Sequence, residues 1–191
     1  MKKYITEVLE FVFRVYVFIF MSVYGLGKIM GGQFYTPERI PHQVASIPLG
    51  EAQAFELAWT FMGHSYGYIL FIGITQILGS LLLLFNKTKL IGVAVLLPVL
   101  TNIIVFDIIF LDKYGALASA VIYFSMLLFI LVFNKERVIM AFRTLTNFSS
   151  NFSNDQTLKL KVYKIISAII IFALIFLFDQ VVVNMIGHGK G

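Results

Sequence analysis

The chain has 191 residues, of which 59% are hydrophobic and 13% charged, and its mean hydropathy is +0.89. A soluble domain is typically about 45–50% apolar and about 25% charged, so this composition excludes an ordinary soluble protein and indicates an integral membrane protein. The formal charge of +5 forms no basic patch on a soluble domain, so we expect it to reflect membrane topology and we expect no nucleic-acid partner.

Five apolar runs are long enough, at roughly 20 residues, to cross a bilayer as helices. They cover residues 9–30, 66–85, 90–111, 115–133 and 162–186. Unbroken runs predict an all-α membrane helical bundle, because a transmembrane barrel would show short alternating segments. We expect a four-span unit at 1–133 that includes a loop at 31–65, an amphipathic segment and linker at 134–161, and an appended fifth span with its tail at 162–191.

The loop after the first span divides into two parts. Three prolines keep its first half irregular, namely Pro37, Pro41 and Pro48. The stretch 49–63 then predicts a short helix with Phe55, Trp59 and Met62 on one face. This helix either lies in the membrane interface, anchored by Trp59, or forms a lid over an outward-facing pocket.

The segment after the fourth span has a helical apolar face, with Val138, Phe142 and Leu145 in register. We expect a helix on the inner leaflet. The polar stretch 149–157 after it predicts a linker, which makes the fifth span an addition to a four-span unit.

Lysine and arginine set the orientation of such a bundle, because cytoplasmic segments carry an excess of them. Ten are spread over three segments, at Lys2, Lys3, Arg14, Lys87, Lys89, Lys135, Arg137, Arg143, Lys159 and Lys161. The opposite segments have only Arg39, Lys113 and Lys190. This bias predicts a cytoplasmic N-terminus and a C-terminus outside. We separately expect the protein to be of the bacterial inner-membrane type.

Polar side chains inside the spans are costly, at about 2.5–3.5 kcal/mol for an ionisable group at mid-bilayer, and they mark candidate sites. With the topology above, most fall in the outer half of the bundle. The candidates for a binding pocket are Lys28, His64, Gln76, Asn102, Asp107, Asp179, Gln180 and Asn184. We expect Lys28, Gln76, Asn102 and Asp179 to approach one another around a pocket that opens outward.

Several of these residues also have a purely structural interpretation. Membrane amides such as Gln76 and Asn102 often only join helices, at about 0.6 kcal/mol per hydrogen bond. Asp107 and Asp179, both near an interface, could snorkel to it or pair simply with another group, and Lys28 could be a snorkelling cap at a span end. Arg14 is interpreted as an anchor at the inner interface.

Catalytic signals are weak. The chain has no cysteine, which excludes disulfides, thiolate zinc sites and ordinary iron–sulfur clusters. No acid–base pair or metal-ligand set stands out, so we identify no catalytic residue and no metal site. The sequence leaves enzyme activity open and favours a non-catalytic role. No cofactor is evident, although the pocket could take a quinone or a lipid.

Several motifs resemble the DoxX-like superfamily of small membrane proteins. They are Gly73-x-x-Gln76-x-x-Gly79, the following leucine run, the basic turn with Thr88, Gly92, "VLTN" ending at Asn102, and "YGLGKI" in the first span. The resemblance covers roughly residues 10–133 and implies a four-helix bundle. Many relatives carry Glu at the position of Gln76, and the fifth span extends beyond the family's unit.

The resemblance implies no single function, because the superfamily includes subunits associated with quinone-linked oxidoreductases, cargo receptors and assembly chaperones. Our first hypothesis is a non-catalytic accessory, binding or assembly factor with a protein partner. The second is a quinone-linked oxidoreductase subunit. The third is a small-solute transporter, which the lack of visible inverted repeats disfavours.

Overall fold

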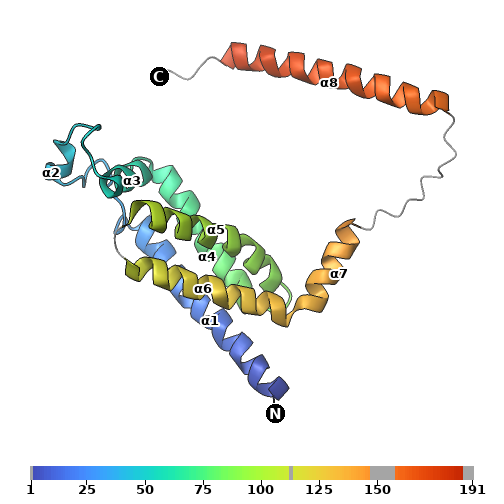
Figure 1. Cartoon of the computed structure of the whole chain (residues 1–191). Helices are drawn as coiled ribbons and strands as arrows, with labels where there is room; N and C mark the ends of the chain where they lie inside the picture. The colour runs from blue at the N-terminus through green and yellow to red at the C-terminus, as the bar shows by residue number, and fades with distance from the viewer. Residues whose placement is uncertain (1, 112–113, 147–157, 187–191) are drawn as a thin grey trace. The chain divides into compact units, whose positions relative to one another are not determined.

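The computed structural model describes residues 2–111, 114–146 and 158–186. All regular secondary structure in this part of the chain is α-helix (Figure 1). The helices are α1 (Lys2–Ile29), α2 (His42–Ala45), α3 (Ala54–Gly63), α4 (Tyr66–Leu84), α5 (Lys89–Phe110), α6 (Tyr114–Phe133), α7 (Lys135–Thr146) and α8 (Leu158–Ile186). Five of them, α1, α4, α5, α6 and α8, are long and apolar enough to cross a membrane. The predicted all-α fold with five such helices is therefore confirmed.

The chain divides into two compact units, Met1–Arg143 and Thr144–Gly191. In the first unit α1, α4, α5 and α6 form a bundle in which α1 packs on α4 and α6, and α5 packs on the same two helices. Its core is apolar and includes Val17, Leu83, Leu96, Leu100 and Leu127, all fully buried.

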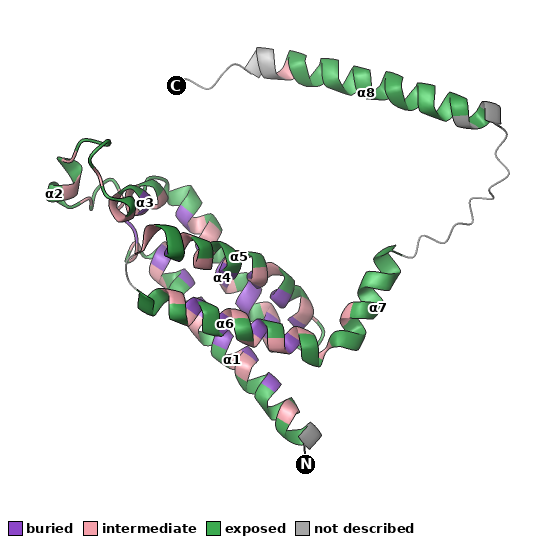
Figure 2. Ribbon diagram, viewed as in Figure 1, coloured by how far each residue is buried: buried purple, intermediate pink, exposed green. Residues whose placement is uncertain are grey.

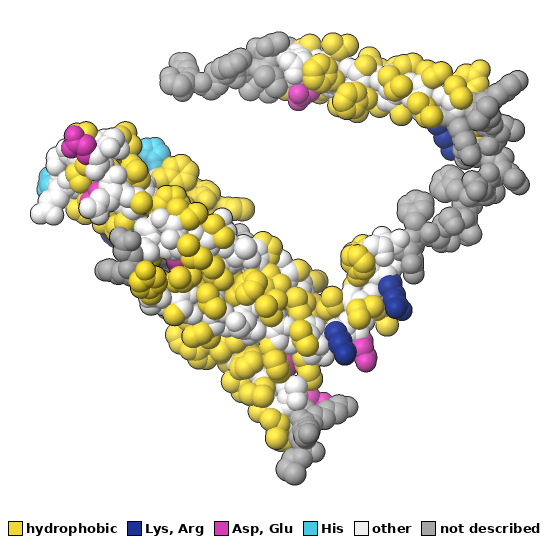
Figure 3. All heavy atoms as spheres, in the orientation of Figure 1, with side chains coloured by type: hydrophobic (Ala, Val, Ile, Leu, Met, Phe, Trp, Pro, Cys, Tyr) yellow, Lys and Arg dark blue, Asp and Glu magenta, His cyan; other side chains and the backbone are white. Residues whose placement is uncertain are grey.

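The surface of the bundle is apolar as well. Large side chains such as Phe11, Phe71, Ile108 and Val132 are exposed, and Figures 2 and 3 show hydrophobic exposed residues along the sides of the helices. Such a surface is stable only in contact with lipid, so the first unit is a membrane bundle.

Glycines let α4 pack closely on both of its neighbours. A Cβ atom on Gly73 would lie 2.9 Å from the carbonyl oxygen of Gly25 in α1. A Cβ on Gly92 of α5 would lie 2.7 Å from the carbonyl oxygen of Gly79 in α4. Close backbone approach between small residues is a common way to hold membrane helices together, because the lipid provides no hydrophobic drive for their association.

A buried polar cluster closes one end of the bundle. Arg14 of α1 donates hydrogen bonds to the carbonyl oxygens of Leu83 and Leu84, the last residues of α4. Glu10 lies 2.7 Å from the Lys89 ammonium and 3.4 Å from the Arg14 guanidinium. Arg14 is only 3% exposed, so it ties α1 to the end of α4, and Glu10 ties α1 to Lys89 at the start of α5. The sequence had suggested an interfacial anchor for Arg14.

The opposite end of the bundle carries α3. This helix begins at Ala54, five residues later than the sequence suggested, because Pro48 and Glu51 form a turn and Gln53 and Glu56 form a capping box. The backbone N–H of Tyr35 donates to the carbonyl oxygen of Trp59, which ties the loop after α1 to α3. We call this the α3 end of the bundle.

Two helices, α7 and α8, follow the bundle in the chain. The predicted amphipathic helix after the fourth span is present as α7, in which Phe142 and Leu145 are exposed. In the second unit α8 has 29 residues, and its described side chains from Val162 to Val181 are exposed within that unit. The predicted linker at 149–157 lies outside the described residues.

Candidate functional site

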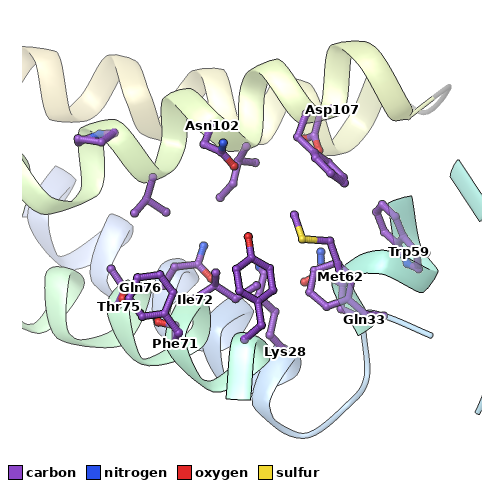
Figure 4. A pocket seen from close by; sticks show the side chains of 16 residues that line it. Lys28, Gln33, Trp59, Met62, Phe71, Ile72, Thr75, Gln76, Asn102 and Asp107 are labelled. Atoms are coloured by element: carbon purple, nitrogen blue, oxygen red, sulfur yellow. The ribbon is translucent and has the colours of Figure 1, made fainter. Parts of the chain in front are cut away.

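A cavity of about 340 Å³ lies at the α3 end, between α4 and α5 (Figure 4). Residues of α1, of the loop after it and of α3 complete its wall. The lining residues are Lys28, Gln33, Phe34, Trp59, Met62, Tyr68, Phe71, Ile72, Thr75, Gln76, Pro98, Val99, Asn102, Ile103, Phe106 and Asp107. A cavity of this size suits a small ligand.

Two buried groups of opposite formal charge line this cavity. Lys28 and Asp107 are each 7% exposed, and they attract each other electrostatically. Figure 4 shows them on opposite walls, and the described residues contain no ion pair between them within 4.0 Å. The Lys28 ammonium lies 6.0 Å from the centre of the Tyr24 ring. Buried charges without a close partner are costly, so this space favours an occupant that can pair with them.

Gln76 supplies an unpartnered hydrogen-bonding atom deeper in the cavity. Its side chain is 1% exposed, and its Nε2 lies 4.0 Å from the Met21 sulfur. Its Oε1 is buried and has no hydrogen-bond partner within the described parts of the chain. A buried carbonyl without a donor costs about 1–3 kcal/mol, so a ligand or water that donates to it would be stabilised there.

The wall above these polar groups is aromatic and apolar. Trp59 of α3 stacks on Phe55 with ring centres 4.3 Å apart, and it lies 6.2 Å from the ring of Phe106 on α5. Met62 of α3 also lines the cavity, as Figure 4 shows. The helix that the sequence suggested could be a lid therefore forms part of the cavity wall.

The cavity reaches the side of the bundle between α4 and α5. Its wall includes Phe71 and Tyr68 of α4, which are 65% and 41% exposed, and exposed Pro98 and Asn102 of α5. A shallow depression of the surface continues from Pro98 and Asn102 towards Phe124 of α6. We call this the α4–α5 opening.

A second, smaller cavity of about 140 Å³ adjoins the first towards α6. Lys28, Gln76 and Asp107 line both cavities, and Tyr123 and Ser119 of α6 line only the smaller one. The three polar residues therefore stand at the boundary between two spaces and present polar atoms to a ligand in either one.

The structure brings four predicted site residues together, namely Lys28, Gln76, Asn102 and Asp107. His64 is placed elsewhere. It directly follows the last residue of α3, is exposed, and lines a separate groove against α2.

The structure does not test the predicted site residues of α8. Asp179 and Gln180 are exposed within the second unit, which is described separately from the bundle, and the side chain of Asn184 lies outside the described part. That Asp179 joins the cavity stays a prediction.

Two polar lining residues were not predicted. Gln33 lies in the loop after α1, where the sequence has no periodicity to indicate its direction. Thr75 adjoins Gln76 in the sequence, but its hydroxyl donates a hydrogen bond of 2.7 Å to the carbonyl oxygen of Phe71. No group of three or more acidic or histidine side chains that could hold a metal ion occurs within the described residues.

Fold and site together define a small helical integral membrane protein with a side-opening intramembrane cavity. The chain is 34% identical over 112 residues to the Uncharacterized protein YwoB of Bacillus subtilis (strain 168), an alignment that covers 58% of this chain and 68% of that protein. The chain therefore belongs to the same family as YwoB. No family model matches the chain, and no solved structure matches it.

Proposed function

We propose that this protein is a DoxX-like accessory or assembly factor of the bacterial cytoplasmic membrane, which binds a ligand in its cavity and holds a protein partner. The observation that carries the proposal is the unpartnered carbonyl of Gln76, 1% exposed, in the wall of a cavity of about 340 Å³. A few oriented polar groups in an apolar pocket are typical of binding sites.

The arrangement favours binding over catalysis. A nucleophile or general base is normally hydrogen-bonded to the group that activates it. Lys28, Gln76 and Asp107 come from three different helices, and no hydrogen bond links any two of them in the described structure. With the N-terminus in the cytoplasm, as the lysine and arginine bias predicts, the α3 end and its cavity face outward.

The test uses Gln76→Leu, a substitution of similar volume that removes the unpartnered carbonyl. Because a buried acceptor without a donor is costly, we expect the variant to melt at the same or a higher temperature than the unsubstituted chain. A specific partner should co-purify with the unsubstituted chain from native membranes. We expect the amount recovered with Gln76→Leu to be at least about tenfold lower, measured by quantitative mass spectrometry. Gln43→Leu, at an exposed position of α2, is the control and should retain the partner. Equal recovery with both variants would contradict the proposal.

A second candidate is a quinone-linked oxidoreductase subunit. The stacked Trp59 and Phe55 beside Phe106 favour it, because a flat ring fits against an aromatic wall. Steady turnover of a quinone by the purified chain alone, lost in Gln76→Leu at an unchanged melting temperature, would replace the accessory role by this one.

A further inference from the structure

The polar groups of the cavity are arranged by depth along the spans. Lys28 is the residue before the last of α1, and Asp107 lies three residues before the end of α5. At 1.5 Å of rise per residue, both lie within roughly 5 Å of a span end, which is the depth of lipid head groups. Gln76 lies ten residues into α4, roughly 15 Å deep. The cavity therefore extends from head-group depth towards the middle of the bilayer.

The charges at the shallow end favour one kind of head group. A cation and a carboxylate on opposite walls are each short of a close counter-charge. A zwitterionic group supplies an anion to Lys28 and a cation to Asp107 together. An anionic group pairs with Lys28 but brings a second negative charge near Asp107, and in a low-dielectric site that repulsion is strong.

The route into the cavity favours a ligand that arrives from the membrane. Its rim includes Phe71 and Asn102 at the α4–α5 opening, on the lipid-facing side of the bundle. Towards the other end α4 and α5 are held together by the contact between Gly79 and Gly92. The helices are thus closely packed at one end, and the cavity lies near the α3 end.

We propose that the cavity binds a zwitterionic membrane amphiphile that enters sideways through the α4–α5 opening. Its anionic group pairs with Lys28 and its cationic group with Asp107, while its apolar part lies along Ile72, Val99 and Ile103. This inference rests on the proposed function, because it names the ligand class of the same site.

The experiment measures lipid binding to the purified full chain by native mass spectrometry and by the shift in melting temperature. The probes are phosphatidylethanolamine, phosphatidylglycerol with the same acyl chains, and glycerophosphoethanolamine, the water-soluble head group. We expect phosphatidylethanolamine to bind at least about tenfold more tightly than phosphatidylglycerol, and the soluble head group to bind at least about a hundredfold more weakly than the lipid.

Variants separate a binding role of the charges from a structural one. Asp107→Asn removes the repulsion of anions, so its preference for phosphatidylethanolamine over phosphatidylglycerol should fall about tenfold. Lys28→Met should weaken the binding of both lipids. Glu38→Gln and Lys87→Gln change exposed charges outside the cavity and should keep the preference of the unsubstituted chain. Melting without added lipid checks that each variant folds.

Each outcome bears on a different part of the inference. Equal binding of the two lipids, or an unchanged preference in Asp107→Asn, would contradict the charge pairing and leave Lys28 and Asp107 as a structural pair. A soluble head group that binds as tightly as the lipid would contradict entry from the membrane. If the chain shows no preference between the two lipids but a partner is still lost in Gln76→Leu, this inference is overturned and the proposed function stands. If the chain prefers phosphatidylethanolamine but no partner depends on Gln76, the lipid-binding inference stands and the partner role is contradicted.

Discussion

At the scale of single residues, Glu10 is the shared acceptor of the polar cluster at the end opposite α3. Its carboxylate contacts the cations of Arg14 and Lys89, and all three side chains are less than one tenth exposed. Arg14 is additionally held by carbonyl oxygens of α4 and by Asn86, whereas the ammonium of Lys89 has Glu10 as its only hydrogen-bond acceptor given by the described structure. Without Glu10, the buried Lys89 ammonium therefore costs more free energy than the Arg14 guanidinium, which keeps its other hydrogen-bond acceptors.

We expect Glu10→Gln to destabilise the bundle by about 3–5 kcal/mol, because removing one partner of a buried pair leaves the other charge uncompensated. The measurement is the free energy of unfolding in mixed detergent micelles. Glu7→Gln, on an exposed position of the same helix, is the matched control and should change stability little. Adding Lys89→Met to Glu10→Gln should restore part of the loss. If the two single glutamine variants unfold alike, the cluster does not stabilise the fold.

This cluster also shows why sequence could not reveal every important residue. Glu10 and Lys89 are 79 positions apart, and each lies near a span end, where a charged side chain is unremarkable. Lys28 and Asp107, in contrast, were found because their depth follows from helix order and rise alone. Depth says nothing about rotation around the helix axis, so the sequence could not separate His64, which lines another groove, from the residues around the cavity.

At the scale of helices, the spans were predictable because an apolar run of about 20 residues reports the bilayer directly. The ends of the helices were harder to predict. The first run was predicted at 9–30, but α1 begins at Lys2, because a helix can continue past the membrane through charged residues such as Glu7. The packing of α4 on α5 depends on glycines, whose close contacts a sequence pattern suggests but does not locate.

Gly92→Ala is expected to weaken this packing. Its Cβ would lie 2.7 Å from the Gly79 carbonyl oxygen and 2.9 Å from the Leu83 nitrogen, and backbone atoms can move away only if the helices separate. We expect a loss of about 1–3 kcal/mol in the free energy of unfolding.

Gly27→Ala is the control for that substitution, because a Cβ at Gly27 in α1 would meet no atom within 4 Å. It should be neutral or stabilise by up to about 1 kcal/mol through helix propensity. Both variants are compared by unfolding in the same detergent. Equal stability of the two would show that α4 and α5 are not held by this contact.

At the scale of the whole molecule, membrane orientation links the cavity to a compartment. The structure places Lys87 and Lys89 at the turn between α4 and α5, and the α3 loop at the other end of the same helices. Positive residues favour the cytoplasmic side. The orientation of the bundle thus decides whether a ligand reaches Lys28 and Asp107 from the outer or the inner leaflet.

The chain offers a direct test of this orientation, because it has no cysteine and each introduced cysteine is therefore unique. We expect a membrane-impermeant maleimide to label Gln43→Cys in intact cells, and to label Lys87→Cys only after the cells are permeabilised. Both positions are exposed, so a difference in labelling reports the side of the membrane and not burial. Lys190→Cys, beyond α8, should also be labelled in intact cells if this helix crosses the membrane. The opposite pattern at Gln43 and Lys87 would place the cavity on the cytoplasmic leaflet. If Gln43→Cys is labelled in intact cells but Lys190→Cys only after permeabilisation, the number of spans is even.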